Sequence, residues 1–159
     1  DMRLVDSGAL FTLQSKVVRC AENVMKYYMD TYLDRCTQLV FCDTSTPKSG
    51  FNLYTELKDM LVKYGVPEEE IAFIHDATSE KQKALLLSKV RKGEIRILIG
   101  STFKLGLGVN VQDKLIALHH LDVPWRPADM VQREGRILRQ GNQNEKVFYF
   151  LWFYVIIYY

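Results

Sequence analysis

Short runs of apolar residues alternate along the chain with longer segments in which apolar residues recur every three or four positions. The short runs are typical of buried strands, and the longer segments are typical of amphipathic helices. The predicted strands are Thr37–Asp43, Ile71–Ile74, Ile95–Ile99, Leu115–His119 and a segment from Val147 onward. The predicted helices are Ser15–Tyr32, Phe51–Tyr64, Ser79–Lys92 and Pro127–Arg139.

Residues with capping preferences support the boundaries of these helices. Ser15 and Ser79 are suited to N-cap positions, and Pro127 is suited to a first helical turn. Gly65 and Gly93 follow helical segments and are typical of helix C-termini. Each helix is therefore delimited by local chemistry as well as by its periodicity.

Alternation of strands and helices predicts an α/β fold with a mostly parallel central sheet that is covered by helices on both faces. In open sheets of this kind, ligands bind at the carboxyl ends of the strands. We therefore expect functional residues directly after the ends of the first four predicted strands, which are Phe41, Ile74, Ile99 and His119.

Composition restricts the class of protein further. The chain has 159 residues, 48% of them hydrophobic, and a formal net charge of +2, which excludes a disordered chain and fits one globular domain. Cys20, Cys36 and Cys42 form no Cys-x-x-Cys pair and are odd in number, and the N-terminus lacks the layout of a signal peptide. These features predict a cytoplasmic protein.

The C-terminal segment Phe148–Tyr159 is unusual because it contains eight aromatic residues and no charge. A helix needs about 20 apolar residues to cross a bilayer, so we expect no membrane association. An uncharged, β-prone segment favours self-association when it is uncovered. We expect it to be buried by the sheet or by another copy of the chain, or to be an artefact of truncation.

The first candidate site follows the third predicted strand, between Gly100 and Asn110. It reads Gly-Ser-Thr-Phe-Lys-Leu-Gly-Leu-Gly-Val-Asn. Two hydroxyls, a lysine and glycines whose backbone amides can approach closely are suited to a phosphate group. The Gly-x-x-x-x-Gly-Lys-Ser/Thr pattern of a Walker A loop is absent from the chain. An ordinary glycine-containing loop after a strand is the alternative interpretation.

The second candidate site lies on the last predicted helix, where Gln132, Arg136 and Arg139 fall within about 60° of each other around the helix axis. Two arginines and a glutamine on one face are suited to phosphate oxygens, and Gly135 beside them leaves room for close approach. The alternative is a solvated basic face, but a glycine in mid-helix costs about 1 kcal/mol and favours a functional reason. Apolar residues on the opposite side, including Val131, are expected to pack on the sheet.

Together the two candidate sites resemble motifs V and VI of superfamily 2 helicases and translocases. The matching residues are Thr102, Gly106, Gly108 and Asn110 for motif V, and Gln132, Gly135, Arg136, Arg139 and Gly141 for motif VI. Residues 122–127 are similar to the Asp-x-x-Trp-Asn-Pro stretch of the Swi/Snf branch, with Arg126 in place of the asparagine, and residues 38–43 resemble motif IV. The resemblance is greatest to helicase-like regions of large proteins from bacterial conjugative elements and phages.

This resemblance implies a RecA-like fold, which is a three-layer α/β/α sandwich. We expect an N-terminal linker and helix in residues 1–36, a helicase C-terminal RecA-like domain in residues 37–150, and an apolar aromatic tail in residues 151–159. Such motors have two RecA-like domains. The chain lacks the Walker A lysine and the Walker B Asp-Glu pair of the first one, so we interpret it as the second domain alone.

The resemblance also implies roles for individual residues. Arg139 would be the arginine finger that reaches the γ-phosphate of ATP across a cleft, and Arg136 would assist it. The residues expected to line the nucleotide side are Gln132, Gly108 and Asn110. The residues expected to contact the nucleic-acid backbone are Ser101, Thr102 and Lys104.

The cofactor implied is ATP with Mg²⁺, bound mainly by the first RecA-like domain. The implied partners are DNA, that first domain and a DNA methylase domain of the same full-length protein, in the cytoplasm of a bacterium. The expected function is that of a C-terminal motor domain of an ATP-dependent DNA helicase or translocase. The isolated domain should not hydrolyse ATP appreciably.

Two other interpretations remain open on the residues alone. The chain could be a non-catalytic module that keeps the helicase fold to dock nucleic acid or a protein. It could also be a free-standing phosphate-binding enzyme, although no convincing nucleophile or general base lies near Gly106. A metal site at His119 and His120 is disfavoured, because adjacent residues of a strand point to opposite faces of the sheet.

Overall fold

The computed structural model describes residues 7–44, 52–106, 109–124, 126–135 and 141–152. The described strands are β1 (Thr37–Phe41), β2 (Ile71–Phe73), β3 (Ile97–Gly100), β4 (Leu115–His120) and β5 (Phe148–Leu151). The described helices are α1 (Ser7–Asp30), α2 (Leu53–Lys63), α3 (Glu80–Lys92), α4 (Thr102–Gly106) and α5 (Pro127–Glu134). Short 3₁₀ turns η1 (Glu68–Glu70), η2 (Ile74–Asp76) and η3 (Gln112–Lys114) connect some of them.

These strands form a single parallel sheet in the order β2-β3-β1-β4-β5. The central strand β1 pairs Val40 with Ile99 of β3 on one side and with His119 of β4 on the other. Every pairing is parallel, so the carboxyl ends of β1, β3 and β4 lie at the same edge. The parallel sheet predicted from the sequence is confirmed.

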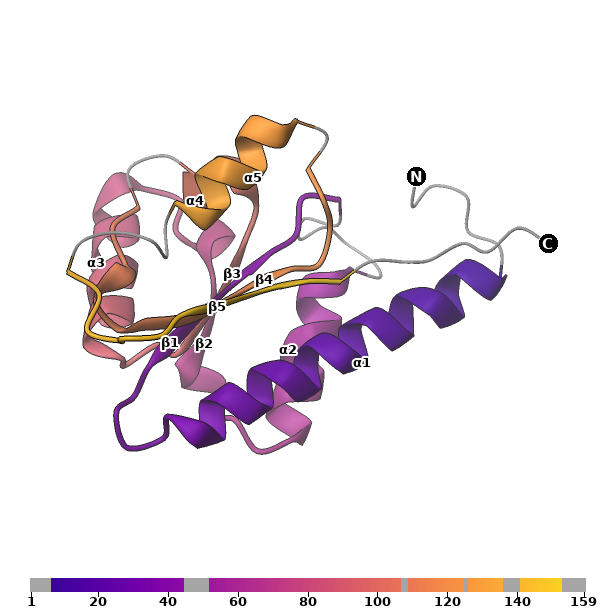
Figure 1. Cartoon of the computed structure of the whole chain (residues 1–159), viewed down its shortest axis with the longest axis horizontal. Helices are drawn as coiled ribbons and strands as arrows, with labels where there is room; N and C mark the ends of the chain where they lie inside the picture. The colour runs from indigo at the N-terminus through magenta and orange to yellow at the C-terminus, as the bar shows by residue number, and fades with distance from the viewer. Residues whose placement is uncertain (1–6, 45–51, 107–108, 125, 136–140, 153–159) are drawn as a thin grey trace.

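Helices cover both faces of the sheet and give the molecule three layers. α1 and α2 lie on one face, whereas α3, α4 and α5 lie on the other or at its edge (Figure 1). This arrangement is the RecA-like α/β/α sandwich that the sequence predicts. The two faces explain why β1 is buried along its whole length and ends in the apolar run Leu39–Phe41.

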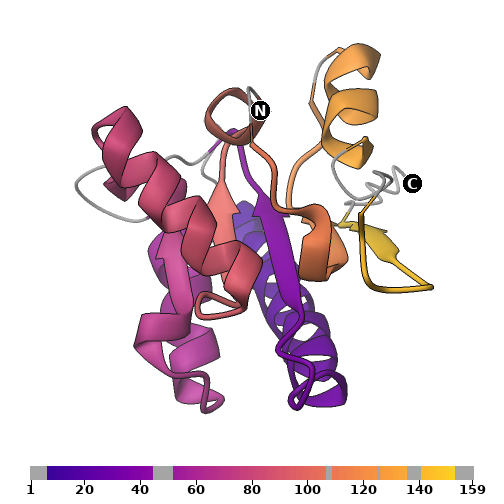
Figure 2. The ribbon, with the colours of Figure 1, turned by 90° about the vertical axis from the view of Figure 1, so that its left-hand side faces the viewer.

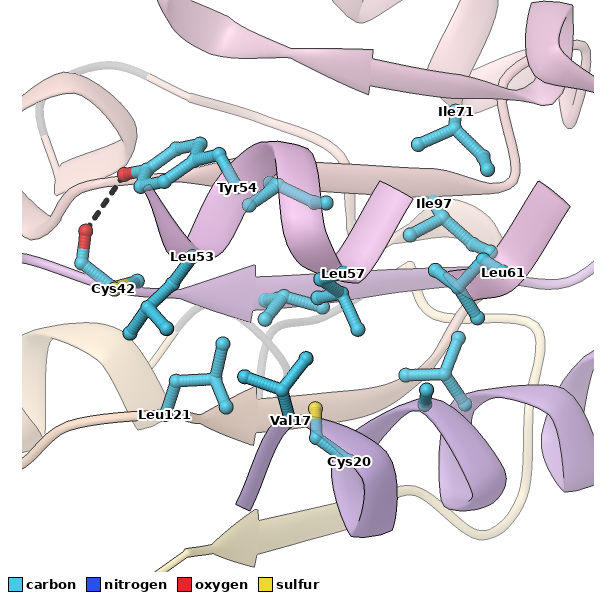
Figure 3. Packing of buried hydrophobic residues seen from close by; sticks show 14 of the residues in the cluster. Val17, Cys20, Cys42, Leu53, Tyr54, Leu57, Leu61, Ile71, Ile97 and Leu121 are labelled. Carbon is cyan, nitrogen blue, oxygen red and sulfur yellow. Dashed lines mark hydrogen bonds between the residues drawn. The ribbon is translucent and has the colours of Figure 1, made fainter. Parts of the chain in front are cut away.

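The core beneath α1 and α2 consists of apolar residues from one face of each helix, which pack on alternate residues of the strands. Val17 and Cys20 of α1 approach Leu57 and Leu61 of α2 above Ile97 (Figure 3). Full burial of each such aliphatic side chain contributes about 1.5–3 kcal/mol relative to exposure. This packing fixes the position of the N-terminal helix against the sheet.

The opposite face has its own apolar cluster. Leu87 and Val90 of α3 and Leu105 of α4 pack on Leu39 and Phe41 of β1. Since Leu39 and Phe41 alternate with Val40, which lies in the first cluster, the period of two along β1 separates the two cores.

Local capping signals in the sequence correspond to the observed helix ends. Ser79 and Gln82 form a capping box at the start of α3, and Gly93 ends that helix with a φ of 75°. Pro127 lies in the first turn of α5, as predicted. Gly65, which follows α2, has a φ of 104°.

Two elements differ from the predictions. α1 begins at Ser7 rather than at Ser15, and its first turns extend beyond the ends of the strands (Figure 1). The predicted start at Ser15 rests on apolar residues that recur clearly at helical spacing only from there onward. The segment after β3 is also not a simple loop, because Thr102–Gly106 forms the short helix α4.

Other expectations are answered only for the described residues. Cys20, Cys36 and Cys42 are buried, and none of them forms a disulfide within the described part of the chain. Leu151 and Trp152 are half-buried, whereas the rest of the expected aromatic tail lies outside the described residues. A search of the described helices finds none with both the length and the apolar character needed to cross a membrane.

Candidate functional site

Side chains from three strand ends meet at the carboxyl edge of the sheet, where the sequence predicted function. Asp43 follows β1, Thr102 follows β3, and Asp122 follows β4. α4 and α5 lie together at this end of the molecule in both views (Figures 1 and 2). The parallel topology therefore brings residues that are about 20 to 80 positions apart in the sequence into one cluster.

Thr102 is held at the first position of α4 by the carboxylate of Asp43. The backbone N–H of Thr102 donates to Oδ1 of Asp43 at 2.6 Å, and its hydroxyl donates to Oδ2 at 2.7 Å. Ser101 stabilises the same turn, because its Oγ accepts from the backbone N–H of Lys104 at 3.3 Å. The hydroxyls of this segment thus organise α4 itself.

Gly100 allows α4 to lie close to the sheet. A Cβ atom at this position would lie 2.5 Å from Cγ2 of Ile74 and 2.7 Å from two side-chain carbons of Leu105. Both neighbours are almost completely buried and have little room to move. The glycine is therefore needed for close packing at the point where β3 leads into α4.

Arg133 of α5 lies at the centre of the cluster, and its side chain has no exposed surface. Its Nε donates to Oγ1 of Thr102 at 2.6 Å, and Nη2 donates to Oδ2 of Asp43 at 2.6 Å and Oδ1 of Asp122 at 3.1 Å. Its Nη1 donates to the carbonyl oxygen of Asp122 at 2.9 Å and to Nδ1 of His120 at 3.2 Å. All five N–H bonds of the guanidinium have an acceptor.

The electrostatics of the cluster are those of one buried cation between two carboxylates. The guanidinium carbon of Arg133 also lies 5.0 Å from the ring centroid of Phe41, within the range of a cation–π contact. Asp43 and Asp122 retain partly exposed side chains, at 33% and 12%. A buried ion pair is favourable only when further hydrogen bonds satisfy its donors and acceptors, as they do here.

Asp122 also connects this cluster to the segment after β1. Its Oδ2 accepts from the backbone N–H of Thr44 at 2.9 Å and from the hydroxyl of Thr44 at 3.0 Å. On the α1 side, Nζ of Lys16 donates to the carbonyl oxygen of Leu121 at 3.0 Å. Burial lowers the pKa of Lys16, and the negative charge of Asp122 opposes that shift.

His120 contributes to the cluster as a neutral acceptor. Arginine has only donors, so Nδ1 of His120 must accept, and the proton of the neutral ring lies on Nε2. Burial, together with the charge of Arg133, lowers the pKa of His120 to about 4. The ring therefore stays neutral at physiological pH.

His119 points to the other face of the sheet, as the alternation of strand residues predicts. Its Nε2 lies 2.9 Å from Oε1 of Gln38, and its ring stacks on Phe150 at a centroid distance of 5.2 Å. Burial lowers its pKa to about 3. Among the described residues, no group of three or more His, Cys, Asp or Glu side chains could hold a metal ion.

The candidate residues of the first site occupy distinct positions. Ser101 and Thr102 are buried, whereas Lys104 is exposed on α4. Asn110 is exposed, and its carbonyl oxygen accepts from Nη1 of Arg91 at 3.0 Å, which ties it to α3. Gly108 lies outside the described residues. The structure therefore places Thr102 and Lys104 in α4, with Ser101 directly before it, and connects Asn110 to α3.

The second site is described only in its first half. Gln132 is half-buried on α5, next to Arg133. Arg136 and Arg139, the two arginines predicted to act on phosphate, lie outside the described residues. Gly135 has a helical φ of −60° and is exposed, and a Cβ there would lie 3.1 Å from the carbonyl oxygen of Val131 and 3.8 Å from that of Gln132.

One detail of the sequence interpretation is wrong. Val131 was expected to pack on the sheet, but it is 69% exposed, whereas Arg133 is 1% exposed and is the residue of α5 that reaches inward. A count of apolar residues on the helix could not identify a buried arginine. The available signal was the pair of aspartates that directly follow β1 and β4, since two carboxylates at one sheet edge require a nearby cation.

Comparison with known proteins finds one family whose model matches most of the chain. The family of helicase conserved C-terminal domains matches residues 21–141, which include the strand ends and both candidate sites. No curated protein sequence matches the chain significantly.

Solved structures with a similar fold are C-terminal helicase domains at low sequence identity. The C-terminal part of the Fun30 ATPase domain is 21% identical, with a TM-score of 0.59, over 82% of this chain and 40% of that one. Mss116p DEAD-box helicase domain 2 bound to an RNA duplex is 18% identical, with a TM-score of 0.64, over 87% of this chain and 50% of that one. The helicase MrfA bound to DNA is 16% identical, with a TM-score of 0.58, over 82% of this chain and 18% of that one. The chain thus spans half or less of these proteins.

Proposed function

The chain belongs to the family of helicase conserved C-terminal domains, and we propose that it is the second RecA-like domain of an ATP-dependent DNA helicase or translocase. Within superfamily 2, we propose the Swi/Snf-like branch, because residues 122–127 resemble the Asp-x-x-Trp-Asn-Pro stretch of that branch. We further propose that the full-length protein is bacterial and cytoplasmic, derives from a mobile genetic element and carries a DNA methylase domain.

The observation that carries this proposal is the match of residues 21–141 to the family. The geometry of the described residues supports it, because the segment that resembles motif V and the helix that begins motif VI are in direct contact. The bond from Nε of Arg133 to Oγ1 of Thr102, at 2.6 Å, joins the two segments at the sheet edge. In a motor, contact between these two segments would link the nucleic-acid side of the domain to its nucleotide side.

Residues of this chain would act on the nucleotide from one side of a cleft between two domains. ATP with Mg²⁺ would be held mainly by the other RecA-like domain, and it supplies the phosphoryl group that is transferred to water. Arg139 and Arg136 would stabilise the charge that develops on the phosphate oxygens. Gln132, with Gly108 and Asn110, would line the same cleft.

We propose DNA as the polymer that the motor follows, with Ser101, Thr102 and Lys104 at the nucleic-acid side. Among the described members of this set, Lys104 is the exposed cation and is suited to a phosphate. MrfA binds DNA in its structure and Mss116p binds RNA, so both polymers need to be compared.

The proposal is tested by Arg139→Ala in the full-length protein. We expect DNA-stimulated ATP turnover to fall by about 10³-fold or more, while ATP binding is retained, because the arginine acts on the transition state. Arg126→Ala, which changes an 84% exposed arginine at the N-cap of α5, is the matched control and should leave turnover unchanged. Undiminished turnover in Arg139→Ala would contradict the proposal and favour a docking module.

A further inference from the structure

The guanidinium of Arg133 connects α5 to three residues that are far apart in the sequence. They are Asp43 after β1, Thr102 at the start of α4, and Asp122 after β4. We propose that Arg133 is a positioning residue that couples α4 to α5. A displacement of α4 by bound DNA is passed through this side chain to α5, which Arg136 and Arg139 follow in the sequence. This inference rests on the proposed function.

The coupling follows because the guanidinium of Arg133 is shielded from water and all of its N–H bonds have acceptors. The five N–H bonds of Arg133 have five acceptors, and the side chain has no exposed surface. Because the guanidinium itself is shielded from water, a displaced acceptor leaves a buried charged donor unpaired. α4 and α5 therefore move together more readily than they separate.

Thr102 is the link on the α4 side. Its hydroxyl accepts from Arg133 and donates to Asp43, and its backbone N–H donates to the other oxygen of Asp43. The next two residues face outward, with Phe103 75% exposed and Lys104 exposed. A polymer that contacts Lys104 would thus act on a helix whose first residue is fixed to Arg133.

Charge alone would not provide this link. The planar guanidinium donates to acceptors on four different residues. A lysine ammonium has three donors on one atom and cannot reach the same set. Arg133→Lys therefore keeps the charge between Asp43 and Asp122 and removes the geometry. This substitution separates a coupling role from a purely electrostatic one.

The experiment measures ATP turnover of the full-length protein with no DNA and with saturating duplex DNA, for wild type, Arg133→Lys and the control Arg126→Lys. We expect the ratio of stimulated to basal turnover to fall about tenfold in Arg133→Lys, with little change in the DNA concentration that gives half-maximal stimulation. Arg126→Lys should retain the wild-type ratio, because Arg126 is exposed on the same helix.

Three outcomes would overturn the inference. Basal and stimulated turnover that both stay at the wild-type level in Arg133→Lys would overturn the coupling and leave the proposed motor intact. A proportional loss of basal and stimulated turnover would assign Arg133 a structural role only. Wild-type protein that shows no DNA-stimulated turnover would overturn the proposed function, and the coupling with it.

A second pair of variants keeps the test valid if Arg133→Lys does not fold. Thr102→Ser retains the hydroxyl that links Asp43 to Arg133, and Thr102→Val has nearly the same shape but removes it. We expect Thr102→Ser to keep most of the stimulation ratio and Thr102→Val to lose about tenfold. Equal ratios in the two variants would overturn the coupling.

Discussion

At the scale of single residues, Arg133 is expected to make a large contribution to stability. Arg133→Met would leave the partly buried carboxylates of Asp43 and Asp122 without their cation. Removal of one partner of such a buried pair costs about 3–5 kcal/mol. Urea denaturation of the chain should show this decrease in the free energy of unfolding.

The control for that measurement is Arg126→Met. Arg126 is 84% exposed, and its Nε lies 3.5 Å from a carboxylate oxygen of Asp129. An exposed pair of this kind contributes between zero and about 1 kcal/mol. If the two methionine variants lost similar stability, the buried network would not be the reason for the effect at Arg133.

The two adjacent histidines predict a dependence of stability on pH. Burial lowers the pKa of His119 to about 3 and that of His120 to about 4, whereas an unfolded histidine titrates near 6.5. As the pH falls below about 6.5, the unfolded state binds protons that the folded state does not, so stability decreases. Above about pH 7 both states are neutral, and this contribution is constant.

Between pH 7 and pH 5.5 we expect each histidine to lower the free energy of unfolding by about 1 kcal/mol. Equilibrium urea titrations at the two pH values measure the change. His120→Gln, whose amide oxygen can still accept from Arg133, should remove about half of the dependence. A flat profile in the wild-type chain would show that the histidines are not buried as neutral groups.

Residue-level chemistry was only partly predictable from the sequence. Ser79, Gly93 and Pro127 were predictable because their effects are local and depend on a few neighbouring backbone groups. Arg133 was not, because its burial depends on acceptors contributed by β1, β3 and β4, which meet only in the folded sheet. A helical wheel of α5 treats an arginine as a surface residue.

At the scale of elements, the position of α4 depends on Gly100. In Gly100→Ala, the added methyl would overlap the buried side chains of Ile74 and Leu105, so α4 must shift from the end of β3. Overpacking of this kind costs about 1–3 kcal/mol. Thermal or urea denaturation measures the loss.

Gly135→Ala is a matched comparison on the next helix. Gly135 is exposed, and its φ of −60° is accessible to alanine, so the change in stability should stay under about 1 kcal/mol in either direction. A loss in Gly135→Ala as large as that in Gly100→Ala would contradict the packing argument.

The elements also show where hydrophobic periodicity succeeds and where it fails. All five described strands were predicted, β1 to β4 because each contains a short apolar run between polar segments and β5 because an apolar run begins at Val147. α4 was interpreted as a loop, because five residues are too few to show a helical period, and its start depends on a bond from Thr102 to Asp43. Contacts between strand ends determine such short elements, and these contacts are not local in the sequence.

At the scale of the whole molecule, the order of the strands determines which surfaces remain available. β1 lies in the centre with β3 and β4 beside it, so the three strand ends that form the Arg133 cluster are adjacent. The same order leaves β5 as the outermost strand of the described sheet on the β4 side. The apolar C-terminal segment noted in the sequence therefore begins at an edge.

The edge strand β5 predicts self-association of the chain. Phe148 is 37% exposed and Tyr149 is 52% exposed, and in the described sheet β5 pairs only with β4. An apolar edge strand with unpaired backbone groups is a template for pairing with another copy, and a lysine at such an edge opposes that pairing. We expect the sedimentation coefficient of the chain to rise with concentration.

Tyr149→Lys should abolish that rise by placing a charge on the edge. Tyr64→Lys is the control, since Tyr64 is also a partly exposed tyrosine, at 39%, but follows α2 away from the edge of the sheet, and this variant should associate as the wild type does. Sedimentation velocity over a range of protein concentrations distinguishes these outcomes. A wild-type chain that stays monomeric throughout would show that β5 is covered within its own molecule, and equal association of Tyr149→Lys would place the contact on another surface.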